Sequence, residues 1–164
     1  GFTDDEIAFR DEARAFFRGL AERGVRVVDG NPVAKDMVAA GQLAFALTDT
    51  DDACLAIKAG KPVAAVFPDQ GEGGMGTLVI PNTIALVRGA RHPEEAQTLI
   101  DYLLSEEVER EVVKSGWSHL PVRRVEVEQE CFDTDGIVSM NVQYAALFDW
   151  LEPSRSELAD IFIR

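Results

Sequence analysis

The stretch at residues 43–59 constrains the fold more than any other part of the chain. It begins with an apolar run of strand length, continues as a polar turn, and from Asp51 onward spaces its apolar residues as a helix does. This order predicts a strand, a turn and a helix. In an open α/β sheet, ligands bind where such a turn leaves the carboxyl end of a strand, because backbone amides of the next helix point outward there.

The polar turn of this stretch has two interpretations. An Asp or Thr can cap the helix, and acidic residues suit the positive end of its dipole, so capping explains the pattern without a ligand. Alternatively, the turn faces a cleft and offers its oxygens and amides to a polar ligand or a hard cation. The residues concerned are Thr48, Asp49, Thr50, Asp51 and Asp52. The sequence leaves both interpretations open.

The rest of the chain alternates between helical and strand-like patterns. Caps, apolar spacing and terminal glycines predict helices near residues 3–24, 31–41, 51–60, 92–104, 105–116 and 142–162, with Pro153 restarting or kinking the last. Strand-like runs occupy residues 25–28, 43–47, 62–67, 77–81 and 82–87, with a further candidate at 125–127. The alternation predicts an α/β fold with a mostly parallel sheet flanked by helices.

Composition and charge exclude several classes of function. The 164 residues suit one compact domain. A formal charge of -13 argues against nucleic acid as a partner, because phosphate backbones are bound by clustered Lys and Arg. No apolar run approaches the roughly 20 residues of a membrane-spanning helix.

Motifs for catalysis and cofactor binding are absent or misplaced. Residues 71–76 match the spacing G-x-G-x-x-G, but a strand-like segment ending in Pro81 follows them instead of a helix, so we expect no dinucleotide cofactor. No G-x-S-x-G elbow is present, and nothing in the sequence demands an enzyme. Cys54 and Cys131 are too few for a disulfide framework, and we expect Cys54 to be a buried unpaired thiol.

Four stretches match one protein family in order and spacing. They are residues 38–52 (VAAGQLAFALTDTDD), 76–83 (GTLVIPNT), 92–96 (HPEEA) and 99–109 (LIDYLLSEEVE). Across about residues 10–164 the chain resembles the type 2 periplasmic solute-binding proteins of ABC transporters, in the branch that includes ferric-iron-binding proteins. The resemblance implies a periplasmic or extracellular, non-enzymatic component of an uptake system. It also implies a small-molecule or metal-ion solute and ABC permease subunits as partners.

The chain departs from this family at the ligand turn. Ferric-binding relatives place two adjacent tyrosines there, and the alignment puts Asp51 and Asp52 at those positions. The tyrosinate ligands of iron are therefore absent. Ferric iron or another metal ion could still bind through Asp49, Asp51 and Asp52, and a small polar or anionic solute is equally open.

Family members are also roughly twice this length and have two lobes, so the chain resembles their second half. The resemblance assigns residues 1–76 and about 137–164 to an α/β lobe, 77–83 to a hinge-like segment with Asn82 as a ligand candidate, and 84–136 to partial first-lobe elements. The apolar residues of that partial lobe need cover. We expect them to fold back onto the resident lobe or to join two chains as a homodimer.

Two other functions compete with solute binding. A ligand-sensing effector domain of a transcriptional regulator would share this fold and also lack catalytic residues. A helix-turn-helix in the parent gene would favour the regulator, whereas a signal peptide and neighbouring permease genes would favour transport. A small hydrolase that uses the acidic turn is the third candidate.

Overall fold

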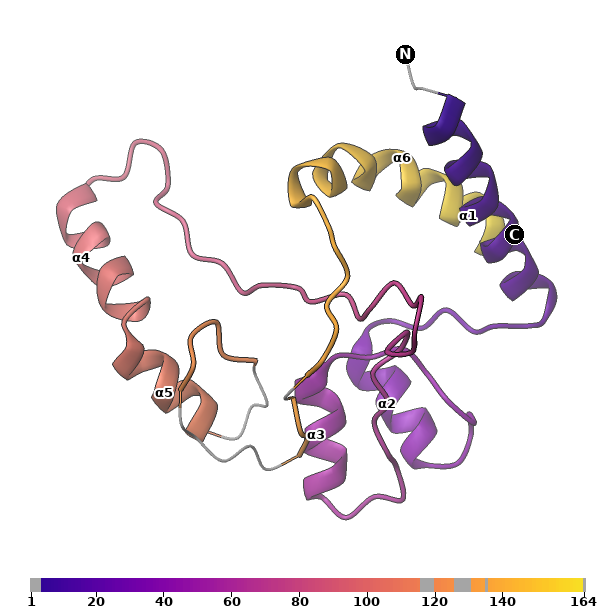
Figure 1. Ribbon diagram of the computed structural model, residues 1–164, viewed down its shortest axis with the longest axis horizontal. Helices are drawn as coiled ribbons and strands as arrows, with labels where there is room; N and C mark the ends of the chain where they lie inside the picture. Colours follow the sequence, from indigo (N-terminus) through magenta and orange to yellow (C-terminus); the bar gives the residue numbers. More distant parts are fainter. Residues whose placement is uncertain (1–3, 116–119, 126–130, 135, 164) are drawn as a thin grey trace. The chain divides into compact units, whose positions relative to one another are not determined.

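The computed structural model describes residues 4–115, 120–125, 131–134 and 136–163, and its regular elements are helices (Figure 1). They are α1 (Asp4–Glu22), α2 (Asn31–Ala39), α3 (Thr50–Lys58), α4 (Pro93–Leu103), α5 (Glu106–Lys114) and α6 (Tyr144–Phe162). Each coincides with a predicted helix. Thr3 and Gly116, which were expected to bound two of them, lie outside the described residues. The chain divides into two compact units, residues 1–29 with 142–164 and residues 30–141.

The first unit consists of α1 and α6, which pack against each other (Figure 1). Charged side chains join the helices: Arg10 and Arg14 of α1 both pair with Glu157 of α6. Phe17 and Phe162 add an edge-to-face ring contact with centroids 6.4 Å apart. The helix α6 continues through Pro153, so the chain does not restart a helix there, and a kink at this proline stays a prediction.

In the second unit, α2 packs against α3, and the buried side chains at this contact are small. They belong to Ala34, Cys54 and Ala56. Small residues let two short helices approach closely, which brings the N-terminal turns of α2 and α3 together. Positive φ angles at Gly41 and Gly60, just after these helices, confirm the glycine stops that the sequence predicted.

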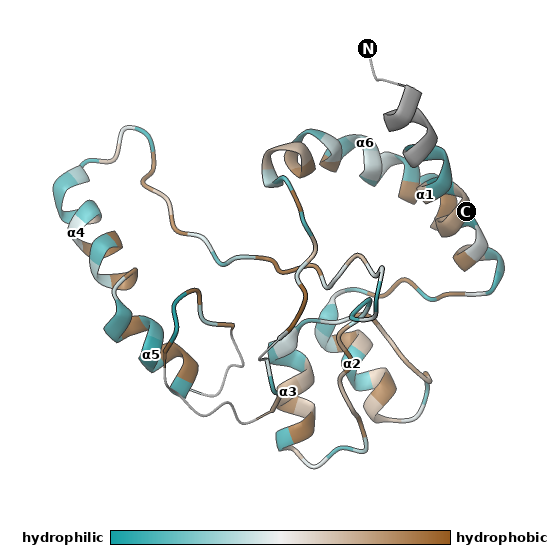
Figure 2. Cartoon of the chain, viewed as in Figure 1, coloured by the Kyte–Doolittle hydropathy of each residue, from teal (hydrophilic) through white to brown (hydrophobic). Residues whose placement is uncertain are grey.

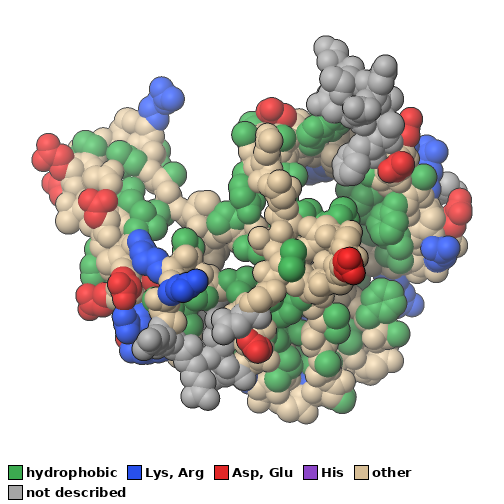
Figure 3. Space-filling view, viewed as in Figure 1, with side chains coloured by type: hydrophobic (Ala, Val, Ile, Leu, Met, Phe, Trp, Pro, Cys, Tyr) green, Lys and Arg blue, Asp and Glu red, His purple; other side chains and the backbone are tan. Residues whose placement is uncertain are grey.

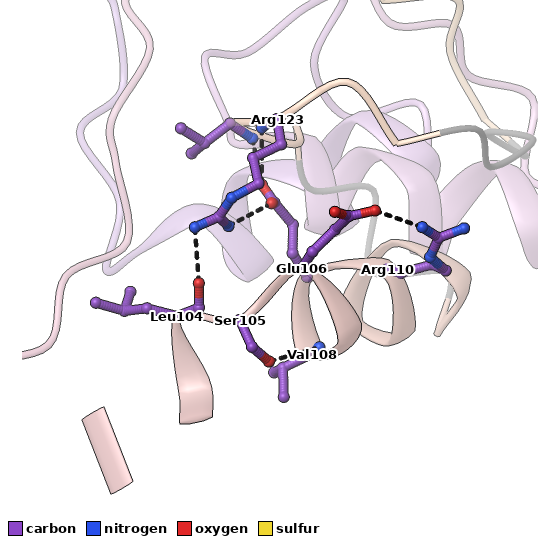
Figure 4. Close-up of polar contacts among 8 residues, drawn as sticks. Leu104, Ser105, Glu106, Val108, Arg110 and Arg123 are labelled. Atoms are coloured by element: carbon purple, nitrogen blue, oxygen red, sulfur yellow. Dashed lines mark hydrogen bonds and ion pairs between the residues drawn. The ribbon is translucent and has the colours of Figure 1, made fainter. Parts of the chain in front are cut away.

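The same unit holds α4 and α5, which follow each other closely and are joined to the segment 120–125 (Figure 4). Ser105 caps α5, as predicted, by accepting a hydrogen bond from the Val108 amide at 3.3 Å. Glu109 accepts from the amides of Val122 and Arg123 at 2.5 and 3.1 Å, and Arg123 Nη2 donates to the carbonyl oxygen of Leu104 at 2.8 Å. These bonds fasten the segment to the start of α5.

The predicted parallel sheet is wrong. Within the described residues the only β-type pairing is an isolated parallel bridge between Thr77 and Ser139. The runs at residues 25–28, 43–47, 62–67, 77–81 and 82–87 have no strand ladders, and the candidate at 125–127 falls largely outside the described residues. The chain is therefore mostly helical where it is regular, and not α/β.

The reason is that a helix bonds within itself, whereas a strand needs a second strand in register. The apolar runs have β propensity, but in the described part of the chain they form no ladder with another strand beyond the single bridge at Thr77. Many of their side chains reach the surface, with 83% of Phe45 and 88% of Leu47 exposed. Apolar residues recur along the non-helical stretches of this unit (Figure 2), and hydrophobic side chains are visible on its surface (Figure 3).

The bridge at Thr77 is held by several hydrogen bonds. The Thr77 amide donates to the Val138 carbonyl oxygen at 2.9 Å, and the Met140 amide donates to the Thr77 carbonyl oxygen at 2.9 Å. Gln70 reinforces the pairing, because its Oε1 accepts from the Val138 amide at 2.7 Å while Nε2 donates to Val138 and Thr77 oxygens at 3.0 Å. Residues 77–92, which directly follow Gly76, form no helix, as the sequence predicted.

Candidate functional site

The turn at residues 48–52 lies at the start of α3, where the sequence placed the candidate site. Asp49 is the N-cap residue: its backbone is extended, with φ −96° and ψ 173°, and Oδ1 accepts from the Asp52 amide at 3.4 Å. Asp51 and Asp52 occupy the first helical turn, near the positive end of the helix dipole. Asp49 therefore caps α3, and whether the turn also contacts a ligand stays a prediction.

Asn31 of α2 holds the second oxygen of the Asp49 carboxylate. Its Nδ2 donates to Asp49 Oδ2 at 2.5 Å, and its carbonyl oxygen accepts from the Thr48 hydroxyl at 3.5 Å. The N-cap residue of α2 is Gly30, with a φ of 98°, so Asn31 is the first residue of the helix. The Asn31 side chain therefore serves the neighbouring turn instead of its own helix.

Lys35, one turn further along α2, reaches the same region. Its Nζ lies 3.9 Å from Asp52 Oδ1 and 2.9 Å from Asp36 Oδ1. The side chains of Lys35 and Asp52 are only 18% and 12% exposed, whereas that of Asp36 is 72% exposed. Water screens charges less where side chains are buried, so Lys35 is the cation that acts most directly on Asp52.

Neither Asn31 nor Lys35 was among the predicted site residues. The available signal was their spacing of four on a predicted helix, which places both on one face. Nothing in the sequence, however, indicated that this face would meet the acidic turn. The contact became visible only once α2 and α3 were packed together.

The two structured carboxylates of the turn have opposite pKa shifts. Partial burial raises the pKa of Asp49, but hydrogen bonds from the Asn31 side chain and the Asp52 amide outweigh it, so this pKa lies below its ordinary value. Burial, followed by the negative charge of Asp49, raises the pKa of Asp52, and the charge of Lys35 offsets this only in part. The turn thus holds one strongly stabilised carboxylate beside a less stable one.

The described carboxylates are not arranged as a metal centre. Over residues 4–115, 120–125, 131–134 and 136–163, no group of three or more His, Cys, Asp or Glu side chains is placed to hold a metal ion. Both oxygens of Asp49 already accept hydrogen bonds, and Asp52 faces Lys35. Chemically, this arrangement is better suited to a polar molecule, which can exchange hydrogen bonds with the turn, than to a bare cation.

Asn82, the remaining predicted ligand residue, lies on the non-helical stretch between the Thr77 bridge and α4. Asn82 is exposed to solvent. The turn receives polar partners from α2, namely Asn31 and Lys35. A ligand role for Asn82 therefore stays a prediction.

A disulfide bond joins the helix of the candidate site to a distant segment. Cys54 of α3 is bonded to Cys131, 77 positions along the chain, with Cα atoms 5.5 Å apart. The expectation of a buried unpaired thiol is therefore wrong, although Cys54 is buried, at 1% exposure. The sequence showed two cysteines but not the folding that brings them together, because their distance depends on the path of the intervening chain.

A separate cavity of about 720 Å³ lies between α1 and α6 in the first unit. Arginine and acidic side chains line it together, and Arg14 is already paired with Glu157 across it. No predicted site residue contributes to its wall. The charges of this cavity are explained by the packing of the two helices.

Comparison with known proteins adds a family to this geometry. The family model described as "Bacterial extracellular solute-binding protein" matches residues 2–139. No curated protein and no solved structure shows a significant similarity to the chain. In the part of the chain that the structure describes, no helix has the length and apolar character to cross a membrane.

Proposed function

The chain belongs to the bacterial extracellular solute-binding protein family, and we propose that its turn at residues 48–52 contacts the solute. Family membership assigns it to the solute-binding proteins of bacterial ABC-type uptake systems, which are not enzymes, so the expected absence of catalysis is confirmed at this level. The match over residues 2–139 is the observation that carries the function. It favours transport over the regulator and hydrolase alternatives.

For the solute itself, we propose a small polar molecule. The turn offers hydroxyls from Thr48 and Thr50 and the carboxylate of Asp51, on a scaffold fixed by Asn31. Ferric iron or another metal ion as cargo is less well supported, because Asp49 and Asp52 already have protein partners and the tyrosines of ferric-binding relatives are missing. Asn82 belongs to this proposal as a further ligand contact.

We also propose that the protein works outside the cytoplasm, in the periplasm or at the cell surface. The disulfide between Cys54 and Cys131 supports this placement, since such bonds persist in oxidising compartments and are rare in the cytosol. The family description agrees with it. ABC permease subunits are the proposed macromolecular partners.

The finer resemblance, to the second half of a ferric-type receptor with residues 77–83 as a hinge-like segment, is supported by exposed apolar side chains. Ile80 and Val87, on the stretch that follows the Thr77 bridge, are 78% and 75% exposed. Apolar surface of this kind is usually covered by another protein surface. We propose that a complementary lobe covers it, and that the isolated chain associates as a homodimer when that lobe is missing.

The function is tested by titrating the oxidised protein with small polar solutes, inorganic anions, ferric citrate and divalent metal ions in a calorimeter. We expect one polar solute to bind, and the combined substitution of Asp49, Asp51 and Asp52 by Asn to weaken it at least tenfold. Glu94→Gln is the matched control, because it removes one carboxylate from the first turn of α4. Equal affinity of the triple variant and the wild type would reduce the cluster to a helix cap.

A further inference from the structure

The packing of α1 on α6 explains why charged side chains gather around the cavity between these helices, but it pairs only some of them. The lining residues of the cavity all belong to the first unit, and its volume of about 720 Å³ is typical of small-molecule sites. Arg14 and Glu157 neutralise each other, with Nη2 2.9 Å from Oε1, and their side chains are 29% and 27% exposed. This pair serves the helix packing and offers little charge to a ligand.

Three other charged residues of the wall have no such partner. Among the residues that the structure describes, none forms an ion pair or a side-chain hydrogen bond with Arg18, Glu22 or Asp160. Arg18 and Glu22 stand four residues apart on α1 and so share one face of that helix, whereas Asp160 comes from α6. The cavity therefore offers one guanidinium and two carboxylates to a molecule that enters it.

The ends of both helices favour a positive charge in the same cavity. The helix α1 ends at Glu22 and α6 ends at Phe162, and residues from the last turn of each helix line the wall. The C-terminal end of a helix carries the negative pole of its dipole, which a nearby cation stabilises. Neither helix has a basic residue in its last turn. A cationic group from outside the chain would therefore be stabilised here.

The remaining wall is apolar. Its members are Ala21, Val25, Ile161 and Phe162. A simple organic cation would leave the guanidinium of Arg18 without a partner, and a simple anion would be repelled by two carboxylates. A guanidinium and a carboxylate can form two parallel hydrogen bonds, so an anionic group is the natural partner of Arg18. A molecule that carries both charges and an apolar part matches every portion of the wall.

We propose that the cavity between α1 and α6 binds a small zwitterion, whose carboxylate pairs with Arg18 and whose ammonium faces Glu22 and Asp160. The apolar part of the ligand covers the apolar wall. An apolar α-amino acid has this chemistry, and so does a short apolar peptide. The site lies in a different unit from residues 48–52, so it does not depend on the role proposed for that turn.

Calorimetric titration of the full oxidised chain tests the site, with L-leucine as the probe. Leucinamide keeps the ammonium and lacks the carboxylate, whereas N-acetylleucine keeps the carboxylate and lacks the ammonium. We expect leucine to bind, and each analogue to bind at least tenfold more weakly. Leucyl-leucine distinguishes the two sources of the zwitterion, because its charges stand farther apart. Tighter binding of the dipeptide would identify a peptide as the ligand, and tighter binding of leucine a free amino acid.

Arg18→Gln and Asp160→Asn each remove one charge from the wall and should weaken leucine binding at least tenfold. Arg23→Gln and Asp149→Asn are the matched controls, because both residues are exposed and lie outside the wall. Circular dichroism shows whether each variant retains its helices, and the ligand analogues test the same charges on the unaltered chain.

A zwitterion site is ruled out if leucine and leucyl-leucine both fail to bind at millimolar concentration, or if either analogue binds as tightly as leucine. It is also ruled out if both wall variants bind within twofold of the wild type. The combined substitution of Asp49, Asp51 and Asp52 by Asn should leave leucine binding unchanged. Loss of leucine binding in that variant would place the ligand at the turn and overturn the assignment to the cavity, so the two sites are distinguishable.

Discussion

The Glu109 carboxylate accepts hydrogen bonds from both the side chain and the backbone amide of Arg123. Oε2 accepts from Arg123 Nη1 at 2.8 Å, and Oε1 accepts from the Arg123 amide at 3.1 Å. The Glu109 side chain is only 14% exposed. A short distance away, Glu106 pairs with Arg110 at 2.5 Å, but those side chains are 58% and 41% exposed (Figure 4). The two glutamates therefore form a natural comparison.

We expect Glu109→Ala to release the segment 120–125 from α5. The substitution leaves the amides of Val122 and Arg123 without their acceptor, and losing hydrogen bonds of this kind costs about 1–3 kcal/mol. Hydrogen exchange at these two amides measures the effect directly. Glu106→Ala is the control and should change stability by less than about 0.5 kcal/mol, because exposed ion pairs contribute little. Unchanged protection of both amides in Glu109→Ala would contradict the prediction.

The same glutamate should make stability depend on pH. Burial raises the pKa of Glu109, but hydrogen bonds from Arg123 and the Val122 amide lower it more, so the folded-state pKa lies below the ordinary value of 4.5. A lowered pKa stabilises the folded state above the unfolded-state pKa, and this contribution is lost as the pH falls through the folded-state value. The difference in unfolding free energy between wild type and Glu109→Gln should therefore be constant at neutral pH and shrink below about pH 4.5. Urea unfolding from pH 7 to pH 3 measures it, and a difference that grows on acidification would refute the assignment.

The disulfide should contribute most of the stability of the second unit. It closes a loop of 77 positions, for which the chain-entropy estimate is about 4–5 kcal/mol. We expect reduction by dithiothreitol and the double substitution Cys54→Ser with Cys131→Ser to lower the urea midpoint to a similar extent. If the two treatments lower the urea midpoint equally, the stability comes from the cross-link and not from the sulfur atoms themselves. A loss below about 1 kcal/mol in both would show that packing of α3 holds this segment without the bond.

The helices could be predicted from the sequence because their signals are local. Asp49 and Ser105 cap the helices that begin beside them, and glycines such as Gly41 and Gly60 end others at positive φ. Each signal lies within a few residues of the structure that it determines. The same reasoning found the capping role of the acidic turn.

Whether the strand-like runs pair, and which residues meet at the site, could not be predicted in this way, because both depend on residues far apart in the chain. The run at residues 43–47 has the composition of a strand, but composition does not supply a partner in register. Likewise, the bond between Cys54 and Cys131 and the approach of Lys35 to Asp52 exist only through the packing of separate segments. Local pattern indicates what a segment can do, and tertiary contacts determine what it does.

The first unit offers a test of half-buried against exposed charge pairing. Glu157 of α6 forms ion pairs with Arg10 and Arg14 of α1, and the Glu157 side chain is 27% exposed. Glu152, on the same helix, pairs with Arg155 one turn away, and those side chains are 77% and 80% exposed. We expect Glu157→Ala to lower the thermal midpoint clearly, with a loss of about 1–2 kcal/mol, and Glu152→Ala to have almost no effect. Similar midpoints for the two variants would mean that ring packing alone joins the helices.

The close approach of the chain to Gly76 leads to the last prediction. Gly76 has a φ of +84°, and a Cβ atom built there would lie 2.7 Å from the Val138 carbonyl oxygen. Gly89 has a similar φ of +77°, but nothing lies within 4 Å of its Cβ position. Alanine at either site carries the strain of left-handed backbone, about 1–2 kcal/mol, and only alanine at Gly76 must also displace backbone atoms.

Gly76→Ala should therefore destabilise the protein by more than Gly89→Ala, and the excess measures the bridge between Thr77 and Ser139. The displaced carbonyl oxygen of Val138 accepts from the Thr77 amide, so Gly76→Ala should lose hydrogen-exchange protection at Thr77 and Met140. Gly89→Ala should retain it, because Gly89 takes no part in this pairing. The prediction is contradicted if the two variants lose equal stability and both amides stay protected in Gly76→Ala. That result would show that residues 138–140 do not pack against Gly76 in solution.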